Sequence, residues 1–218
     1  MNYLLNTLKL SIYGLLWGFP VPIILALLLN QIRKQGIKKK IQLLIYAPNF
    51  VSVIVLCGMV RMFLSPVGPM NKLLGISTNW MTMPAAFRTI YIASGIWQGA
   101  GWASIMYTAA LSNASKELEE AAIMDGANLL QQIFYIKLPV IKPVLLTALS
   151  VRIIDAARTF DIIWAMTEGG PNSSSETISI MIYKTLTRYN DIGYASAMAV
   201  VFIVVLVVFT LVLSLIHI

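Results

Sequence analysis

Four charged side chains recur at three-residue spacing inside an apolar stretch: Arg152, Asp155, Arg158 and Asp161. A charge at membrane depth costs at least ~2.5 kcal/mol unless it is paired or hydrated, so such residues are functional candidates. On one helix, successive members would lie about 60° apart with alternating sign, so that neighbours could pair. Two interpretations stay open. The series either locks the helix against its neighbours or lines a hydrated path.

The rest of the chain offers little for catalysis. It has one histidine, His217, and one cysteine, Cys57, which lies in an apolar run. These exclude a histidine-based catalytic centre, a metal site of the usual ligands and an intrachain disulfide. No G-x-x-x-x-G-K-[ST] phosphate loop is present. We therefore expect a non-catalytic chain that binds no metal or cofactor itself.

The elements that must position the charges are membrane helices. Of 218 residues, 58% are hydrophobic and 11% are charged, against roughly 25% charged in soluble domains. The net charge of +7 could suggest nucleic acid, but the basic residues gather at the ends of apolar segments, which indicates a bilayer and no nucleic acid. A bilayer core needs roughly 20 apolar residues per helix. This predicts five spans, at about 4–29, 41–64, 88–111, 140–166 and 194–216.

The orientation is predicted from the connector at 31–40, which carries Arg33 and four lysines. Cytoplasmic loops are enriched in lysine and arginine, so this connector is expected inside the cell. Alternation then places the N-terminus and the loops 65–87 and 167–192 outside. The loop 112–139 and the C-terminus are placed in the cytoplasm.

The cytoplasmic loop 112–139 carries a spaced pattern of small, charged and apolar residues. Its members are Glu120, Ala121, Ala122, Asp125, Gly126, Ile136, Leu138 and Pro139. We expect a short helix over 120–127, in which the two alanines allow close approach to a partner. Gly126 would end or bend this helix, and Pro139 would start the next one. So structured a loop between membrane helices predicts a binding partner.

This pattern resembles the EAA motif of the permease subunits of ATP-binding-cassette importers, which reads E-A-A, three residues, G, nine residues, I-x-L-P. Every position matches, and Asp125 matches the common D before the glycine. The resemblance implies a coupling helix that sits in a cleft of the nucleotide-binding subunit. It also implies a bacterial plasma (inner) membrane location and three kinds of partner: a second related permease, two ATP-binding subunits that hold ATP and Mg, and an extracytoplasmic solute-binding protein.

A second stretch, 160–183, resembles the signature of carbohydrate-importer permeases of the MalF and UgpA types. It contains a tight outer turn followed by a predicted short amphipathic helix, and the turn residues are Thr167, Gly169, Gly170 and Pro171. The resemblance implies that a sugar or oligosaccharide is transported. The alternatives are another solute such as a glycerol-phosphate-type compound, a secondary transporter, or an intramembrane enzyme that uses the charges at 152–161.

The resemblance implies the MetI-like type I importer fold, an all-α membrane protein in which 1–218 forms a single transmembrane domain. The five predicted helices correspond to the core of that fold. Permeases of the carbohydrate group usually have a further helix before these five, so we expect this chain to be a fragment that lacks it. Residues 213–218 read as one frame of a transposon end used to prepare sequencing libraries, and we expect them to be foreign to the natural protein.

Overall fold

A computed structural model describes residues 2–157, 159–170 and 175–217. These residues form helices and no strand, which confirms the predicted all-α class. The elements in chain order are α1 (Asn2–Gly18), α2 (Pro20–Gln31), α3 (Gln35–Tyr46), the 3₁₀ turn η1 (Ala47–Phe50), α4 (Val53–Phe63), α5 (Pro69–Leu74), the 3₁₀ turn η2 (Trp80–Thr82), α6 (Pro84–Ser112), α7 (Lys116–Met124), α8 (Leu129–Gln132), the π-helical turn η3 (Ile133–Lys137), α9 (Leu138–Ala157), α10 (Asp161–Thr167), α11 (Ile178–Thr187) and α12 (Ile192–His217).

Three helical runs in the described part of the chain are long and apolar enough to cross a bilayer. They are Tyr3–Gln31, Leu129–Ala156 and Ile192–Leu211, and they overlap the first, fourth and fifth predicted spans. The third predicted span is α6, whose 29 residues include Arg88 and Gln98 and are less uniformly apolar. At 1.5 Å per residue α6 is about 43 Å long, which exceeds the thickness of a bilayer core.

The second predicted span, at about 41–64, is not one continuous helix. The structure divides it into α3 and α4, which are bent by 95° relative to each other at a short break. Pro48 lies in the intervening turn η1, where its missing N–H and fixed φ favour a tight turn over a continuing helix. Ser52 then caps α4 by accepting a hydrogen bond from the backbone N–H of Val55 at 3.3 Å. Counted as one broken span, this pair would be a fourth crossing.

The fourth predicted span, 140–166, is wrong at both ends. Helical structure begins earlier, at Leu129, and α9 ends at Ala157. Phe160 has φ −137° and ψ −57°, and α10 starts afresh after it. The charged series therefore does not follow one continuous helix, because Arg152 and Asp155 belong to α9 and Asp161 begins α10.

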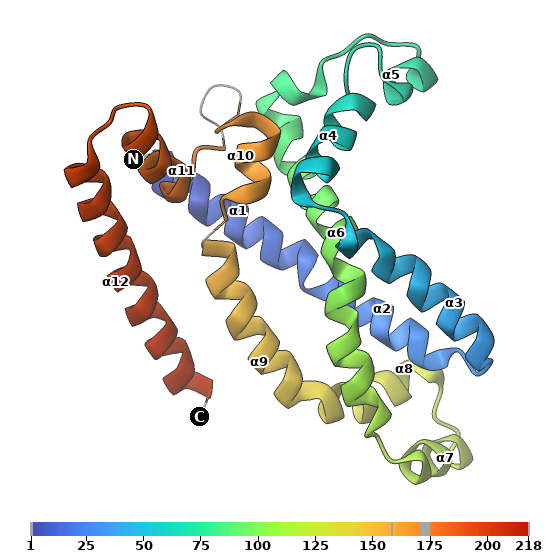
Figure 1. Ribbon diagram of the computed structural model, residues 1–218. Coiled ribbons are helices and arrows are strands. Elements are labelled where there is room, and N and C mark those ends of the chain that lie inside the picture. Colours follow the sequence, from blue (N-terminus) through green and yellow to red (C-terminus); the bar gives the residue numbers. More distant parts are fainter. Residues whose placement is uncertain (1, 158, 171–174, 218) are drawn as a thin grey trace.

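α6 is the central helix and packs along α2, α1 and α9 (Figure 1). A buried cluster toward one end joins Leu10, Cys57, Phe87 and Ile163, and a second toward the other end joins Ala26, Tyr107, Leu111 and Ile141. Small residues allow membrane helices to approach each other closely. Gly101 of α6 has this role, because an added Cβ there would collide with the carbonyl oxygen of Ile45, whereas an added Cβ at Gly95 or Gly99 would meet nothing.

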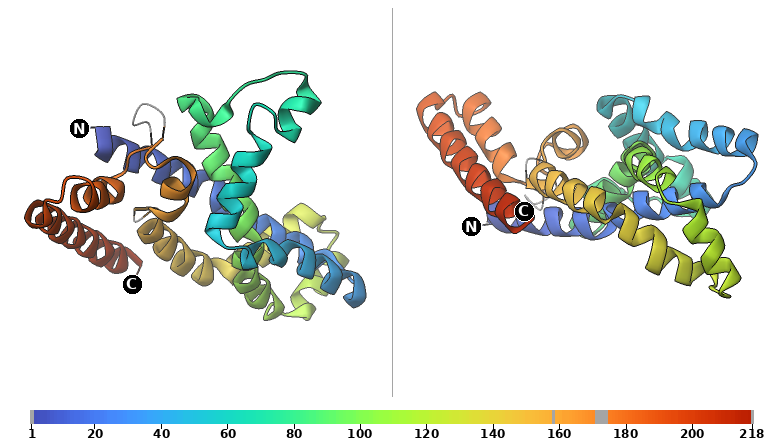
Figure 2. Two further views of the ribbon diagram at one scale, coloured as in Figure 1. Left: turned by 45° about the horizontal axis from the view of Figure 1, so that its top comes forward. Right: turned by 90° about the horizontal axis from the view of Figure 1, so that it is seen from below.

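The connecting elements gather at two opposite ends of the molecule (Figure 1). The start of α1 lies at the same end as α5, α10 and α11, and the C-terminal end of α12 lies at the end that also carries α7 and α8. This grouping agrees with the alternation predicted from the loops. α12 packs against α9 and α11 and stands apart from the rest of the bundle (Figure 2).

Candidate functional site

The predicted loop helix is α7, which starts four residues earlier than expected and ends at Met124. Ser115 caps its first turn through the N–H of Leu118. At the other end, the N–H of Ala127 bonds the carbonyl of Ala122 at 2.9 Å, and the N–H of Gly126 bonds that of Ile123 at 3.0 Å. With Gly126 at φ +80°, this is a Schellman motif. The prediction that Gly126 ends the helix is confirmed.

The predicted coupling residues fall into an exposed and a half-buried group. Those exposed are Glu120, Ala121, Asp125, Gly126 and Pro139, and those half-buried are Ala122, Ile136 and Leu138. Apolar side chains are exposed beside them, with Ile123 at 53% and Met124 at 86%. An apolar surface that is exposed on a structured loop is typical of a docking site.

Pro139 does not start the next helix, contrary to the prediction. It is the second residue of α9, which continues directly from α8 through the π-helical turn η3. The N–H of Leu138 reaches the carbonyl of Ile133, five residues back, which marks the π turn. Such a turn accommodates the proline because the hydrogen-bond register already changes immediately before it.

Lys137 is the residue of this loop that sequence reasoning misjudged. A lysine in a polar loop is expected to be exposed, but Lys137 is 2% exposed. Its Nζ donates to Oδ1 of Asn30 at 2.7 Å and lies 3.6 Å from Oε1 of Glu119. The only signal in the sequence is its position between Ile136 and Leu138, two residues of the motif.

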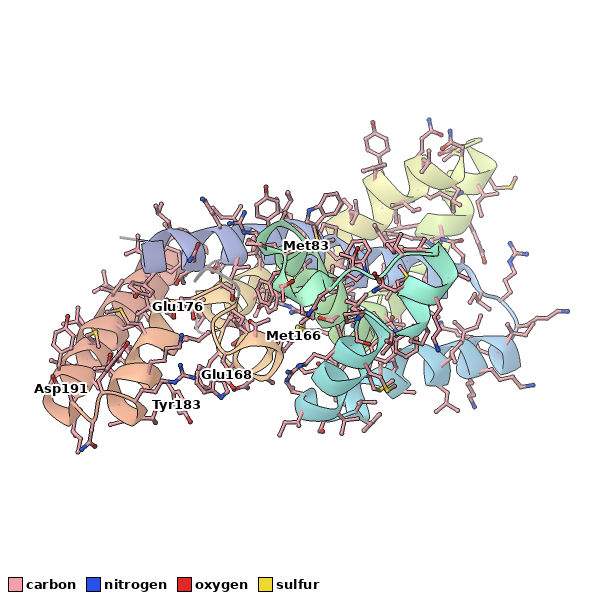
Figure 3. The ribbon with its side chains drawn as sticks, turned by 90° about the horizontal axis from the view of Figure 1, so that it is seen from above. Met83, Met166, Glu168, Glu176, Tyr183 and Asp191 are labelled. Atoms are coloured by element: carbon pink, nitrogen blue, oxygen red, sulfur yellow. The ribbon has the colours of Figure 1, made fainter. Side chains whose placement is uncertain are left out.

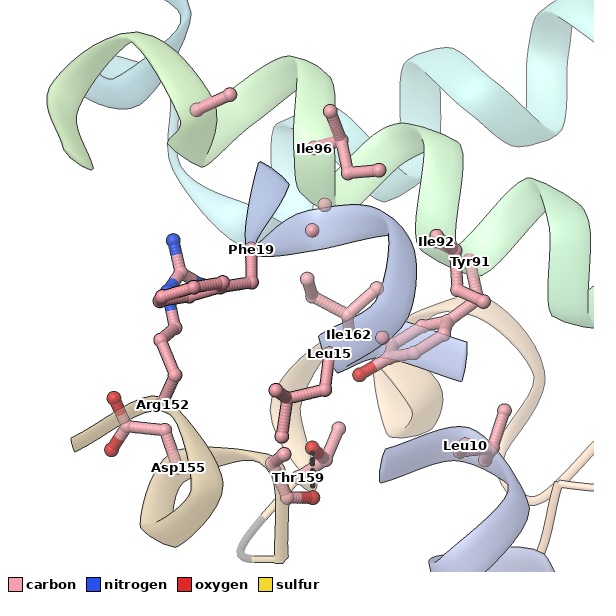
Figure 4. Close-up of a pocket in the computed structure, with 15 residues that line it drawn as sticks. Leu10, Leu15, Phe19, Tyr91, Ile92, Ile96, Arg152, Asp155, Thr159 and Ile162 are labelled. Atoms are coloured by element: carbon pink, nitrogen blue, oxygen red, sulfur yellow. Dashed lines mark hydrogen bonds between the residues drawn. The ribbon is translucent and has the colours of Figure 1, made fainter. Parts of the chain in front are cut away.

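Two members of the charged series, Arg152 and Asp155, line a cavity of about 210 Å³. Figure 4 shows both reaching from α9, while Tyr91 of α6 lies across the cavity and Phe19 lies beside Arg152. The pairing predicted for neighbours is not found between Arg152 and Asp155, which form no ion pair with each other. Asp161 is exposed at the start of α10, and Arg158 lies outside the described residues.

The predicted outer turn closes through its backbone. The N–H of Gly170 bonds the carbonyl of Thr167 at 3.0 Å. Gly169 and Gly170 have φ +112° and +75°, and an added Cβ on either would collide with Glu176 or Ser175. Only glycine combines an unstrained positive φ with the absence of a Cβ, so no other residue fits at these two positions. Pro171 lies outside the residues that the structure describes.

The helix after this turn is α11, as predicted, and two ion pairs of different burial tie it to its surroundings. Lys184 pairs with Glu176, with side chains 16% and 11% exposed. Arg188 pairs with Glu168 at 2.6 Å, with side chains 51% and 61% exposed. Arg188 also lies over Trp164, which packs edge-on against Tyr183. Seen from above, Glu168 and Tyr183 lie close together on the same side of the molecule (Figure 3).

The two ion pairs predict different costs of removal. A Lys184→Met variant leaves the carboxylate of Glu176 buried without its cation, so we expect the free energy of unfolding to fall by about 3 kcal/mol. Arg188→Met removes an exposed pair and should cost less than about 1 kcal/mol. Thermal unfolding of both variants in the same detergent checks this. Equal thermal midpoints for the two variants would contradict the finding that the Lys184 pair is buried and the Arg188 pair is exposed.

Known proteins match this chain over nearly its whole length. Residues 18–217 match the model of a family described as binding-protein-dependent transport system inner membrane component. The polygalacturonan/rhamnogalacturonan transport system permease protein YteP of Bacillus subtilis is 35% identical over 201 residues, which cover 89% of this chain and 63% of that protein. The trehalose/maltose transport system permease protein MalF of Thermococcus litoralis is 38% identical over 145 residues, 65% of this chain and 48% of that one.

Solved structures agree with these relatives. A chain of a bacterial ABC transporter involved in the import of the acidic polysaccharide alginate superposes with a TM-score of 0.94 at 34% identity, over 99% of this chain and 78% of that chain. The MetNI methionine ABC transporter superposes with a TM-score of 0.61 at 18% identity, over 99% and 89% of the two chains, which indicates a shared fold. This chain spans less than two thirds of YteP and of the Bacillus subtilis protein LplB.

These matches cover the loop motif, the charged segment and the outer turn together. They also agree with the expectation of a multi-pass, non-catalytic membrane subunit with the MetI-like fold. The chain belongs to the family of binding-protein-dependent transport system inner membrane components.

Proposed function

We propose that this chain is the permease subunit of an ATP-driven importer of a sugar or oligosaccharide. The observation that carries the proposal is α7, an exposed helix with a Schellman end that contains the E-A-A of a complete E-A-A…G…I-x-L-P spacing over 120–139. Relatives named for polygalacturonan, trehalose and maltose transport support the sugar class. Residues 1–218 would form one transmembrane domain.

The assembly would contain a second, related permease, two ATP-binding subunits that hold ATP and Mg, and an extracytoplasmic solute-binding protein. A binding protein is part of the solved alginate importer complex that this chain resembles. The five basic residues of the connector at 31–40 favour placing that end, with α7 and the C-terminus, in the cytoplasm. The N-terminus and the outer turn would then face the binding protein.

The coupling step would use the exposed surface of α7. Ala121 is small and exposed, so a partner's groove could approach the helix backbone closely, while Ile123 and Met124 offer apolar area for burial. When ATP brings the two nucleotide-binding subunits together, each would carry its docked helix as a rigid body. The membrane helices would follow, and the pathway would open to the outside.

The cavity beside Arg152 and Asp155 would form part of the sugar pathway. Its lining combines these two charged side chains with Tyr91, Thr159 and the apolar ring of Phe19. This combination suits a solute with hydroxyl groups and apolar faces. Its volume of about 210 Å³ is smaller than the ~300–1,000 Å³ of complete ligand sites. The second permease would supply the remaining wall.

The function is tested by co-expressing the chain with a second permease, an ATPase and a solute-binding protein of the same importer and reconstituting the assembly in vesicles. We expect oligosaccharide uptake to require ATP on the side of the membrane where the ATP-binding subunits lie. It should also require the sugar-loaded binding protein on the opposite side. Uptake that persists without any ATPase subunit would instead show a secondary transporter. Uptake of a glycerol-phosphate-type solute in place of sugars would correct the substrate class.

The cavity makes a prediction of its own. Gly95 lines it, and an added Cβ there meets nothing within 4 Å, so a Gly95→Leu side chain has room at its Cβ and would fill part of the cavity. We expect oligosaccharide uptake to fall by about tenfold, a barrier change of roughly 1.4 kcal/mol. Gly58→Leu is the matched control, because Gly58 is equally open but lies in α4, away from this cavity. Equal uptake rates in the two variants would place the pathway elsewhere.

A further inference from the structure

Lys137 connects three helices of the bundle at the end that carries α7. Its ammonium group donates a hydrogen bond to Oδ1 of Asn30 in α2 at 2.7 Å and lies 3.6 Å from the carboxylate of Glu119 in α7. Lys137 itself is the last residue of η3, before α9. We propose that Lys137 is a positioning residue that transmits the movement of α7 to α2 and α9. This inference rests on the coupling role proposed for α7.

The burial of Lys137 makes its contacts with Asn30 and Glu119 costly to break. A lysine that is 2% exposed has lost almost all its hydration, so protein acceptors must replace the water around its ammonium group. The two described acceptors lie on different elements, so separating α7 from α2 would strip the ammonium of one of them. A surface lysine would exchange such a partner for water at little cost. The buried one resists the separation, and the three elements therefore move together.

The connection reaches the packed interior through α2. Asn30 lies in the last turn of α2, beside Leu29, which is 2% exposed, and one turn after Ala26, which is fully buried. Ala26 belongs to the buried cluster with Tyr107 of α6 and Ile141 of α9. A displacement of α7 would therefore act on the cluster that joins the central helix to its neighbours, beyond the direct chain connections of α7.

The π-helical turn explains how Lys137 comes to face α2. A π turn contains one more residue than an α-helical turn, so every side chain after it is rotated relative to a regular helix. In η3 the turn ends at Lys137 itself. The neighbours Phe134 and Tyr135 remain exposed, at 62% and 79%, while Lys137 turns inward.

The test measures how many substrate molecules the reconstituted assembly imports per ATP hydrolysed. Lys137→Met keeps the length of the side chain and removes its charge, and we expect this ratio to fall by about tenfold, which corresponds to roughly 1.4 kcal/mol of lost coupling. Lys137→Arg keeps the charge and should import nearly as many substrate molecules per ATP as the wild type. Lys142→Met is the matched control, because Lys142 is an exposed lysine one turn further along α9, and its ratio should equal that of the wild type.

A charge reversal separates positioning from simple stability. In the double variant Glu119→Lys with Lys137→Glu, the ion pair is restored with opposite sign, and the amide of Asn30 can donate to the new carboxylate. We expect this variant to recover the ratio lost in Lys137→Met, even if the single variant accumulates poorly in the membrane. A wild-type ratio in Lys137→Met, or no recovery in the double variant, would overturn the inference. If the wild-type assembly itself hydrolyses ATP without import, the proposed function fails as well.

Discussion

A Gly126→Trp variant is expected to reach the membrane in normal amount and to lose at least about tenfold of its ATP-driven uptake. Gly126 has φ +80°, a conformation that costs an ordinary residue about 1–3 kcal/mol. An added Cβ meets no atom of this chain within 4 Å. The bulk of the indole ring would therefore act on whatever docks against α7, and the membrane helices would keep their packing. Uptake and ATP hydrolysis measured on the same vesicles check this.

Two smaller substitutions separate the effect of backbone strain from the effect of side-chain bulk. Gly126→Ala adds the backbone strain with little bulk and should lose less uptake than the tryptophan variant. Gly126→Asn should lose least, because asparagine adopts the left-handed conformation more readily than other residues and serves at helix ends. Wild-type uptake in Gly126→Trp would remove α7 from the coupling step. An equal loss in the tryptophan and alanine variants would show that backbone strain, and not docking, is responsible.

A Gly101→Leu variant is expected to lose its folded structure, with little protein surviving extraction from the membrane. The new Cβ would collide with the backbone carbonyl of Ile45, and a backbone atom cannot turn aside as a flexible side chain can. Overpacking in a core costs about 1–3 kcal/mol when side chains can adjust, and here α3 itself would have to move. The measurement is the fraction of protein that remains monodisperse after heating in detergent.

The matched control for Gly101 lies two residues away in the same helix. Gly99→Ala adds a Cβ that meets nothing within 4 Å, so its thermal midpoint should equal or slightly exceed that of the wild type. If Gly101→Leu were as stable as Gly99→Ala, the close crossing of α3 and α6 would be wrong. Alanine and leucine both favour a helix over glycine, so helix propensity alone cannot produce a loss of stability at Gly101.

The sequence predicted the loop better than the helices. The spacing from Glu120 to Pro139 is read directly from the order of residues, and Gly126 ends α7 as its conformational freedom suggests. The break between α3 and α4 was missed because hydropathy measures only how apolar a stretch is. Pro48 was visible, yet prolines are tolerated inside membrane helices, so it could not by itself locate a bend of 95°.

The charged segment shows the same limit. The spacing of Arg152, Asp155, Arg158 and Asp161 was correctly noted, but its interpretation assumed one continuous helix. The structure ends α9 before Phe160, so Asp161 belongs to another element than the residues at the cavity. A three-residue spacing implies neighbours only while the backbone stays helical.

The membrane class, the all-helical fold, the family motif and the helix end at Gly126 follow from the order of residues, because composition, spacing and local backbone preference are properties of short stretches of chain. The folded chain was needed to show that Lys137 is buried and bonded to Asn30, which lies 107 positions away in the chain. It also decided that Gly101, and neither Gly95 nor Gly99, is the point of close helix approach. Burial and contact depend on what the folded chain brings from elsewhere, and no local pattern contains that information.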